Sequence, residues 1–264
     1  MSGWSSGLWQ RSAKPFFVGS NPTPDSNFFL KYQQFIMKIA AISDLHGNLS
    51  FDVKKSDILC ICGDIVPLKV QSFHDGSKKW FKKRFLPWCE KQDVKEIYII
   101  GGNHDFFIAN HSNELTEILK GTNVHYLEDT SATFTDENGK DYVIYGTPWC
   151  HQFGDWAFMG YSDEALGNIF RKMPDNVDIL LTHDAPYGFS DVCEQDVPWN
   201  KHEHIGNKGL TEAVMEKKPK LLLHGHLHST NHESEKMGDT EVYNVSLLDE
   251  NYDLKFKPLY LDLA

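Results

Sequence analysis

The chain has 264 residues, of which 41% are hydrophobic and 24% charged, and its formal net charge is −11 at pH 7. This composition is typical of a soluble globular protein that is long enough to bury a substantial core. The negative charge argues against a general affinity for nucleic acid or anionic lipid, but it permits a small anionic substrate held by a local positive centre. No run of about 18 uninterrupted apolar residues occurs, so we expect no membrane span.

Residues 1–36 differ in composition from the rest. They are rich in Ser, Gly and Pro, and their three basic and one acidic residues give +2, which leaves −13 on residues 37–264. Frequent Ser and scarce acidic residues also occur in transit peptides, but an amphipathic, Arg-rich helix is missing. The stretch "FFVGSNPTP" resembles the conceptual translation of a tRNA gene. We therefore interpret residues 1–36 as an unstructured leader, consistent with a start-site artefact, and residues 37–264 as the folded domain.

From Met37 onward, short apolar runs alternate with helical or irregular stretches. The apolar runs predict strands at 38–43, 57–62, 96–100, 124–127, 178–183, 220–225, 241–246 and 258–263. Residues 131–146 predict a hairpin with its turn at 137–140. Helices are expected at about 76–92, 111–120, 162–173 and 208–217. Several runs are apolar on both faces, which predicts an α/β fold with sheets sandwiched by helices.

The five cysteines do not form a C-x-x-C pair; they are Cys60, Cys62, Cys89, Cys150 and Cys193. Cys60 and Cys62 lie two apart in a predicted strand, where they share one face and are poorly placed to form a disulfide. We predict free buried thiols in a reducing, cytoplasmic compartment. Cys150 follows Trp149 in a predicted loop, so it is the candidate for an exposed thiol.

Five of the predicted strands are each followed by Asp, Asn or His. These residues are Asp44, His46, Asp64, Asn103, His104, Asp105, His183, His226 and His228. After one strand such residues are ordinary turn chemistry. Their recurrence after five strands favours a common site, because ligand sites form at the edge where the carboxyl ends of α/β strands lie.

The spacing and chemistry of these residues favour metal binding. Asp44 and His46 lie two apart, so in extended backbone they point the same way and can bind one ion. The same spacing pairs His226 with His228, although a turn there could direct them to two different ions. Asp64 offers two oxygens and can bridge. Carboxylate, amide and imidazole ligands without thiolate suit Mn, Fe, Zn, Co or Ni and disfavour a structural zinc site.

The ordered motifs D-x-H, G-D, G-N-H-D, a single His and G-H-x-H resemble the signature of the calcineurin-like metallophosphoesterases, from Met37 to the C-terminus. The resemblance implies a four-layer sandwich of two mixed β-sheets flanked by helices, and metal-dependent hydrolysis of phosphate esters. It implies that one metal ion is bound by Asp44, His46, Asp64 and His228. It implies that a second is bound by Asp64, Asn103, His183 and His226.

The resemblance also implies a mechanism. The two ions would acidify a water molecule and stabilise an in-line displacement at phosphorus. His104 occupies the family's position for the acid that stabilises or protonates the leaving oxygen, and Asp105 would orient it.

The stretches "YGTPWCHQFGDWAF" and "VDILLTHDAPYGFSD" resemble the brain metallophosphoesterase-domain proteins and their microbial relatives, which implies a phosphodiesterase acting on small cyclic nucleotides. The segment 184–187 departs from the Gly-Pro-Pro-like loop of those proteins, so the resemblance does not extend to substrate contacts there. Two alternatives remain: a phosphomonoesterase acting on small phosphates or phosphoproteins, and a non-catalytic scaffold, which the complete ligand set disfavours. The charge of −13 disfavours a nuclease.

Other polar and aromatic residues near the expected site have simpler interpretations. His202 and His204 are interpreted as loop residues rather than ligands. Trp149, Trp156 and Tyr187 are candidates for stacking on a base, and packing in the core or at the rim is an equal alternative.

Overall fold

The structure is a computed structural model that describes residues 36–192, 203–230 and 232–264. The leader predicted at 1–36 lies outside this part of the chain except for its last residue. His202 and Cys193 also lie outside it.

The first sheet has five strands in the order β13-β1-β2-β3-β4. Strands β1 to β4 run parallel, and β13 pairs antiparallel with β1. Their bounds are β1 Met37–Ile42, β2 Ser56–Cys62, β3 Val94–Ile100, β4 Val124–Tyr126 and β13 Leu259–Leu263. The all-buried β2 is the doubly covered strand that its apolar sequence predicted.

The second sheet has six strands in the order β11-β12-β10-β9-β6-β5, with a parallel centre and antiparallel edges. Their bounds are β5 Thr130–Thr135, β6 Asp141–Thr147, β9 Ile179–Thr182, β10 Leu221–His224, β11 Glu235–Met237 and β12 Thr240–Asn244. The predicted hairpin is confirmed as β5–β6, where Asp136 Oδ1 accepts hydrogen bonds from the N–H groups of Asn138 and Lys140. A small ladder pairs β7 (Cys150–His151) with β8 (Met159–Gly160).

In the described part of the chain, the helices lie where the sequence predicted them, with one addition. The predicted helix at 76–92 is a continuous run of α2 (His74–Trp80), the π-helical η2 (Phe81–Phe85) and α3 (Leu86–Cys89). The others are α5 (Ser112–Leu119), α6 (Asp163–Phe170) and α7 (Lys208–Lys217), and the unpredicted addition is α4 (Phe106–Asn110). Ser162 Oγ accepts from the Ala165 N–H and Asn207 Oδ1 from the Leu210 N–H, so side-chain caps begin α6 and α7.

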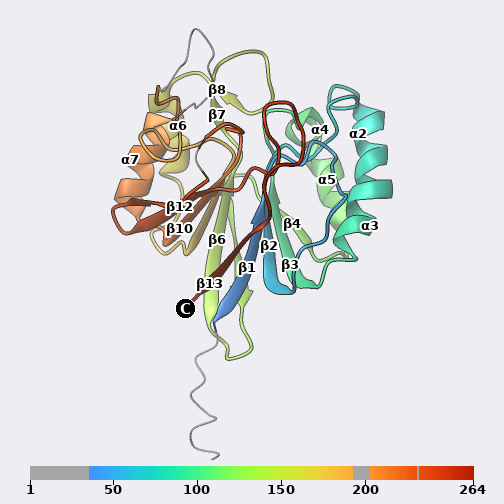
Figure 1. Ribbon diagram of the computed structural model, residues 1–264, viewed down its shortest axis with the longest axis horizontal. Helices are drawn as coiled ribbons and strands as arrows, with labels where there is room; N and C mark the ends of the chain where they lie inside the picture. Colours follow the sequence, from blue (N-terminus) through green and yellow to red (C-terminus); the bar gives the residue numbers. More distant parts are fainter. Residues whose placement is uncertain (1–35, 193–202, 231) are drawn as a thin grey trace, which may run out of the picture. The chain divides into compact units, whose positions relative to one another are not determined.

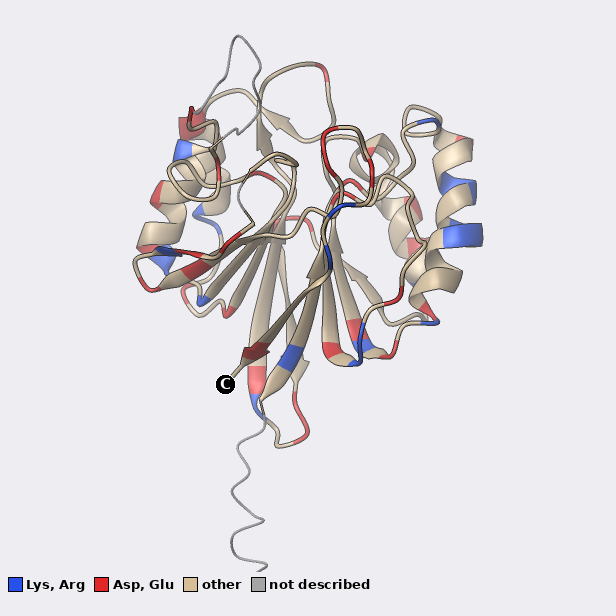
Figure 2. Ribbon diagram, in the orientation of Figure 1, with Lys and Arg blue, Asp and Glu red and all other residues tan. Residues whose placement is uncertain are grey.

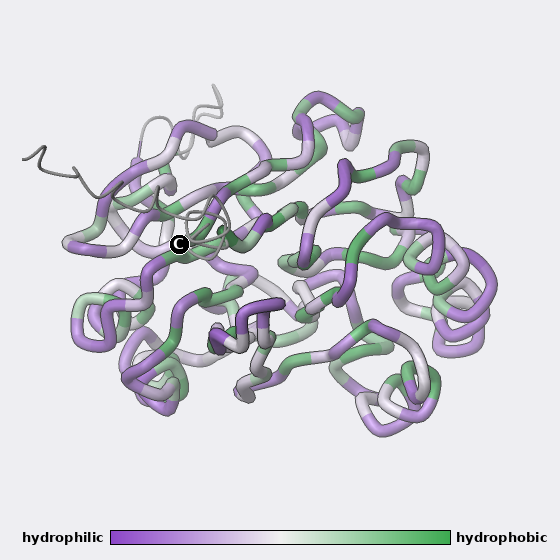
Figure 3. The backbone as a smooth tube through the Cα atoms, turned by 90° about the horizontal axis from the view of Figure 1, so that it is seen from below, coloured by the Kyte–Doolittle hydropathy of each residue, from purple (hydrophilic) through white to green (hydrophobic). Residues whose placement is uncertain are grey.

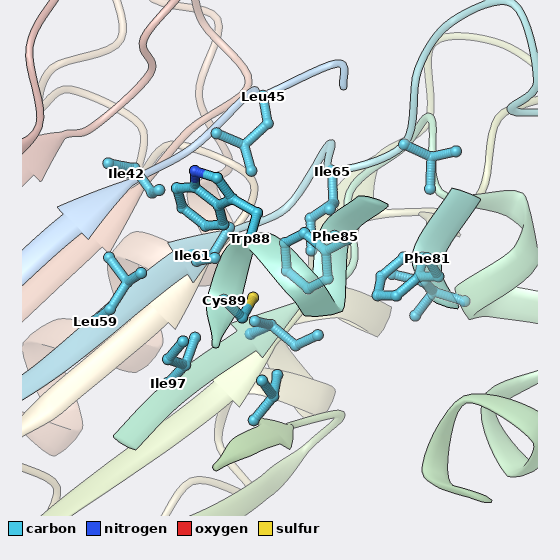
Figure 4. Close-up of a cluster of buried hydrophobic side chains, with 14 of the residues drawn as sticks. Ile42, Leu45, Leu59, Ile61, Ile65, Phe81, Phe85, Trp88, Cys89 and Ile97 are labelled. Carbon is cyan, nitrogen blue, oxygen red and sulfur yellow. The ribbon is translucent and has the colours of Figure 1, made fainter. Parts of the chain in front are cut away.

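Three apolar layers hold these elements together and confirm the four-layer sandwich (Figure 1). One layer fills the space between the sheets, a second lies between the first sheet and α2 to α5, and a third lies between the second sheet and α6 and α7. Figure 4 shows part of the second layer, in which Phe81, Phe85 and Trp88 belong to the same buried cluster as Leu59 and Ile61. Figure 3 shows hydrophilic and hydrophobic residues alternating along the outer helices, as expected for helices with one buried face.

The described cysteines are free and buried: Cys60, Cys62, Cys89 and Cys150. The expectation of an exposed Cys150 is wrong, because residue 150 belongs to β7 rather than to a loop, and its side chain is fully buried. Among the described helices, none is both long and apolar enough to cross a membrane.

Candidate metal centre

The predicted site residues converge at the carboxyl edge of the two sheets, in the loops above the strand ends in Figure 1. A bridge between Ser43 and Ser246 lies just beyond β1 and β12, and it joins the two sheets there. The Asp44 N–H donates to the Gly63 carbonyl, and the Gly225 N–H donates to the His183 carbonyl. Backbone hydrogen bonds therefore link the loop after β1 to the loop after β2, and the loop after β9 to the loop after β10.

Four of the predicted ligands have left-handed backbone, with φ of 55° at Asp44, 40° at His46, 52° at Asp64 and 69° at His226. Such values are uncommon for residues other than Gly and gather at functional sites. The expectation that Asp44 and His46 point the same way from extended backbone is therefore wrong, because both residues have left-handed backbone. Their side chains nevertheless reach the same cluster. At Gly102 a Cβ would lie 2.3 Å from Asp64 Oδ1, so only Gly permits this approach.

The first group of ligand atoms comprises Asp44, His46 and His228, within 4.8 Å of one another. His228 Nε2 lies 3.2 Å from Asp44 Oδ1, and His46 Nε2 lies 3.4 Å from Asp64 Oδ2. Both ring nitrogens of His46 are buried and lack a hydrogen-bond partner among the described residues. A buried imidazole without a partner is costly unless a ligand occupies it, so these residues fit a metal ion.

The second group is arranged around His183. Its Nδ1 donates to the Cys62 carbonyl at 2.7 Å, which turns Nε2 toward Asn103 Oδ1 at 3.0 Å and Asp64 Oδ1 at 3.5 Å. The ring of His226 lies 5.1 Å from that of His183. His ligands of metals commonly donate their second nitrogen to a carbonyl in this way, and the bond fixes the ring orientation.

The electrostatics of the cluster attract positive charge. Burial disfavours the charged form of His183, but Asp64 outweighs it and raises the pKa to about 10. Burial likewise opposes the charged form of His228, but Asp44 raises its pKa to about 9. Burial lowers the pKa of His46 to about 4. The buried carboxylates of Asp44 and Asp64 thus stabilise positive charge at the neighbouring histidines. Divalent metal ions bound by the neutral histidines would supply this positive charge in place of protons.

His104 lies beside this cluster, and its side chain is half-buried. Its N–H donates to Asp64 Oδ1 at 2.8 Å, and its ring Nε2 lies 3.9 Å from Asp64 Oδ2. On the other side, His104 Nδ1 lies 2.6 Å from Gln71 Oε1. The centres of the His104 and Trp156 rings lie 4.5 Å apart. Sequence reasoning missed Gln71, because nothing in its local sequence connects it to a residue 33 positions away.

Asp105 does not have the partner that we expected. Its fully buried carboxylate accepts hydrogen bonds from the N–H groups of Gly102 at 2.9 Å, Ile65 at 3.1 Å and Val66 at 3.0 Å. It joins the loop that carries Asp64 to the loop that begins at residue 101, and Gln71 takes the orienting position beside His104. Burial and the neighbouring Asp64 raise the pKa of Asp105 to about 7.

Replacing Asp105 by Ala should destabilise the fold by about 3 kcal/mol or more, because three buried N–H groups would lose their acceptor at roughly 1–3 kcal/mol each. Urea denaturation measures this loss. Asp155→Ala, at an exposed position, is the control and should stay within about 0.5 kcal/mol. A loss below about 1 kcal/mol in Asp105→Ala would contradict this structural role.

Aromatic rings surround the cluster. Tyr252 lies 4.8 Å from the ring of His46, and Phe153 lies 5.2 Å from that of His226. Neither was singled out from the sequence. Cys150 was not expected here either, although it lies within 4.8 Å of ligand atoms of His183 and His226.

The remaining sequence candidates have other partners. Trp149 Nε1 donates to Asp129 Oδ2, which makes it a packing residue. His204 Nδ1 hydrogen-bonds to Asp191 at 2.6 Å, in line with its interpretation as a loop residue. Tyr187 lies against His204 and is partly exposed.

Comparisons with known proteins agree with this geometry. A UPF0046 protein of Caenorhabditis elegans, T07D4.2, is 27% identical over 253 residues, covering 86% of this chain and 60% of that protein. Human metallophosphoesterase domain-containing protein 1 is 27% identical over 249 residues, covering 86% of this chain and 71% of that protein. The chain thus spans about three fifths of the nematode relative's length.

The fold also matches solved structures. The crystal structure of phosphopantetheinyl hydrolase from Mycobacterium tuberculosis superposes with a TM-score of 0.51 at 13% identity, over 81% of this chain and 90% of that one. The family of calcineurin-like phosphoesterases matches residues 37–230, which include all the predicted ligands. The chain therefore belongs to the calcineurin-like phosphoesterase family.

Proposed function

We propose that this protein is a metal-dependent phosphoric ester hydrolase with a binuclear centre, and that it acts as a phosphodiesterase on small, including cyclic, nucleotides. The observation that carries the proposal is the position of Asp64. Its Oδ2 lies 3.4 Å from His46 Nε2 and its Oδ1 lies 3.5 Å from His183 Nε2, so one carboxylate faces both ligand groups.

We assign the ligands to two ions as the family resemblance implies. One ion would be held by Asp44, His46, Asp64 and His228. The other would be held by Asp64, Asn103, His183 and His226. Oxygen and imidazole ligands suit Mn, Fe, Zn, Co or Ni. When bound, two such ions supply an acidified water and charge stabilisation at the phosphoryl oxygens.

His104 would provide the proton for the leaving oxygen. Gln71 Oε1 accepts from the Nδ1–H of His104, and Nε2 lies on the side of the ring that faces Asp64. Nε2 would donate its proton from the imidazolium form of the ring, which the nearby Asp64 carboxylate favours, and the neutral ring would retain the Nδ1 proton. A group within reach of the leaving oxygen contributes typically 10²- to 10⁴-fold to the rate.

The surroundings of the cluster support a nucleotide as substrate. Trp156, Phe153 and Tyr252 each keep a partly exposed ring beside a histidine of the site, and such rings stack on bases. A cleft of about 570 Å³ begins at His46 and includes Arg84. Figure 2 shows acidic residues in the loops above the strand ends. The positive charge of Arg84 would therefore help this cleft to attract an anionic ligand.

The free buried thiols support a reducing, cytoplasmic location. The charge of the whole chain, −11, supports a small phosphate ester rather than nucleic acid or a membrane surface as the partner.

The test compares a diester with a monoester in the presence of Mn²⁺. We expect bis-p-nitrophenyl phosphate and cyclic nucleotides to be hydrolysed with a higher kcat/KM than p-nitrophenyl phosphate and nucleoside monophosphates. The opposite order would favour the phosphomonoesterase, and no hydrolysis with any tested metal would favour the scaffold.

A further inference from the structure

A second cluster of metal-ligating side chains lies in the helical layer beside the first sheet. It consists of His74 in α2, His111 between α4 and α5, and Glu114 in α5, and one ligand atom from each lies within 4.8 Å of the others. None of these residues belongs to the metal centre described above.

The distances in this cluster are those of a metal site. Glu114 Oε1 lies 3.1 Å from His74 Nε2 and 3.3 Å from His111 Nδ1. In a tetrahedral zinc site with bonds of about 2.0–2.1 Å, neighbouring ligand atoms are roughly 3.3 Å apart. Both nitrogens are therefore already spaced from the carboxylate oxygen as ligands of one ion are.

The surrounding residues orient the three ligands. Asp75 Oδ1 lies 2.9 Å from His74 Nδ1 and accepts its proton, so that Nε2, which faces Glu114 Oε1, is the nitrogen that can bind a metal ion. The arrangement of carboxylate, histidine and metal is common in metalloproteins. The His111 ring stacks on the buried Phe107, and Lys78 binds the other oxygen of Glu114.

We propose that His74, His111 and Glu114 bind a divalent cation of the zinc class, with the fourth position open to water. Two imidazoles and one carboxylate form a three-ligand set that zinc accepts. The side chains are 36%, 39% and 37% exposed, so an ion can enter from solvent without opening the fold.

A cation bound at this cluster would stabilise the neighbouring contact between Gln71 and His104. His74 follows Gln71 by three residues, and His111 lies in the segment that continues from His104 through α4. A cation bound to both would hold the two sides of the Gln71–His104 contact together. The site would thus stabilise the segment that orients the proposed proton donor.

A hydrogen-bonded network without metal is the competing explanation, and Glu114→Gln separates the two. Glutamine keeps the shape and still accepts hydrogen bonds through its carbonyl oxygen, but it is a poor ligand for zinc. His125→Ala is the matched control, because it removes an exposed histidine that pairs with Glu96 at 2.6 Å outside the cluster.

The experiment titrates chelator-treated full-length protein with Zn²⁺ by calorimetry and with Co²⁺ by visible absorption. We expect Glu114→Gln to lose one equivalent, or to bind it at least about 100-fold more weakly, since loss of an outer-shell partner alone costs 10- to 100-fold. His125→Ala should titrate like the wild type. Zn²⁺ should also raise Tm more in the wild type than in Glu114→Gln.

Identical stoichiometry and affinity in the wild type and Glu114→Gln would overturn the proposal. So would an equal Tm response to Zn²⁺ in the two proteins, which would show that the cluster is a hydrogen-bonded network only. Failure of the Asp64 centre would be recognised separately, because Asp64→Asn changes a different set of ligands.

Discussion

Replacing Asp64 by Asn should lower kcat by at least about 10³-fold and reduce the bound metal. The carboxylate faces both ligand groups, and it is the one predicted ligand shared between the two ions. Its loss removes a negative charge from a buried site, where charge stabilisation by metal ions contributes several kcal/mol to the transition state. Each 1.36 kcal/mol corresponds to a factor of ten in rate.

Elemental analysis and steady-state kinetics of Asp64→Asn measure both effects. Asp136→Asn is the matched control, because Asp136 is also a buried aspartate that accepts backbone hydrogen bonds, but in the β5–β6 turn. The control should keep its metal content and its activity. Unchanged metal stoichiometry together with retained activity in Asp64→Asn would contradict the assignment.

Replacing His104 by Ala should keep both metal ions and lower kcat by roughly 10²- to 10⁴-fold for a substrate with an alkoxide leaving group. The loss should be much smaller for p-nitrophenyl esters, because p-nitrophenolate needs little protonation. A ribose oxygen, as in a cyclic nucleotide, needs a proton and should show the full effect.

Comparing the two leaving groups in one variant distinguishes proton donation from other roles. An equal loss on both substrates would indicate phosphate binding or charge stabilisation by His104. Loss of metal in the variant would make the residue structural. Gln71→Ala is an informative companion, since removing the acceptor at 2.6 Å should misorient the ring and give a smaller effect in the same direction.

Much of the fold was predictable because its signals are local. The short apolar run at 57–62 favoured a covered strand, and the Asn138–Gly139 pair marks a hairpin turn. The site was predictable for a topological reason, since polar residues after parallel strands share one edge. The short α4 was missed because five residues after a turn carry too little periodicity to indicate a helix.

Other features depend on tertiary contacts that no local pattern reports. The partners of Asp105 are N–H groups from two loops, one of them about 40 residues earlier in the chain. The burial of Cys150 follows from pairing of β7 with β8 across a connecting loop. The left-handed backbone at Asp44 and His46 replaced the extended geometry that two-residue spacing suggested.

The central claim is that Asp64 lies between two metal ions, and anomalous scattering from crystals grown with Mn²⁺ tests it most directly. We predict two strong peaks within coordination distance of the Asp64 carboxylate, roughly 3.5–4 Å apart as in other two-metal sites. One should lie against Asp44, His46 and His228, and the other against Asn103, His183 and His226. A single peak, or peaks that Asp64 does not contact, would contradict the binuclear assignment.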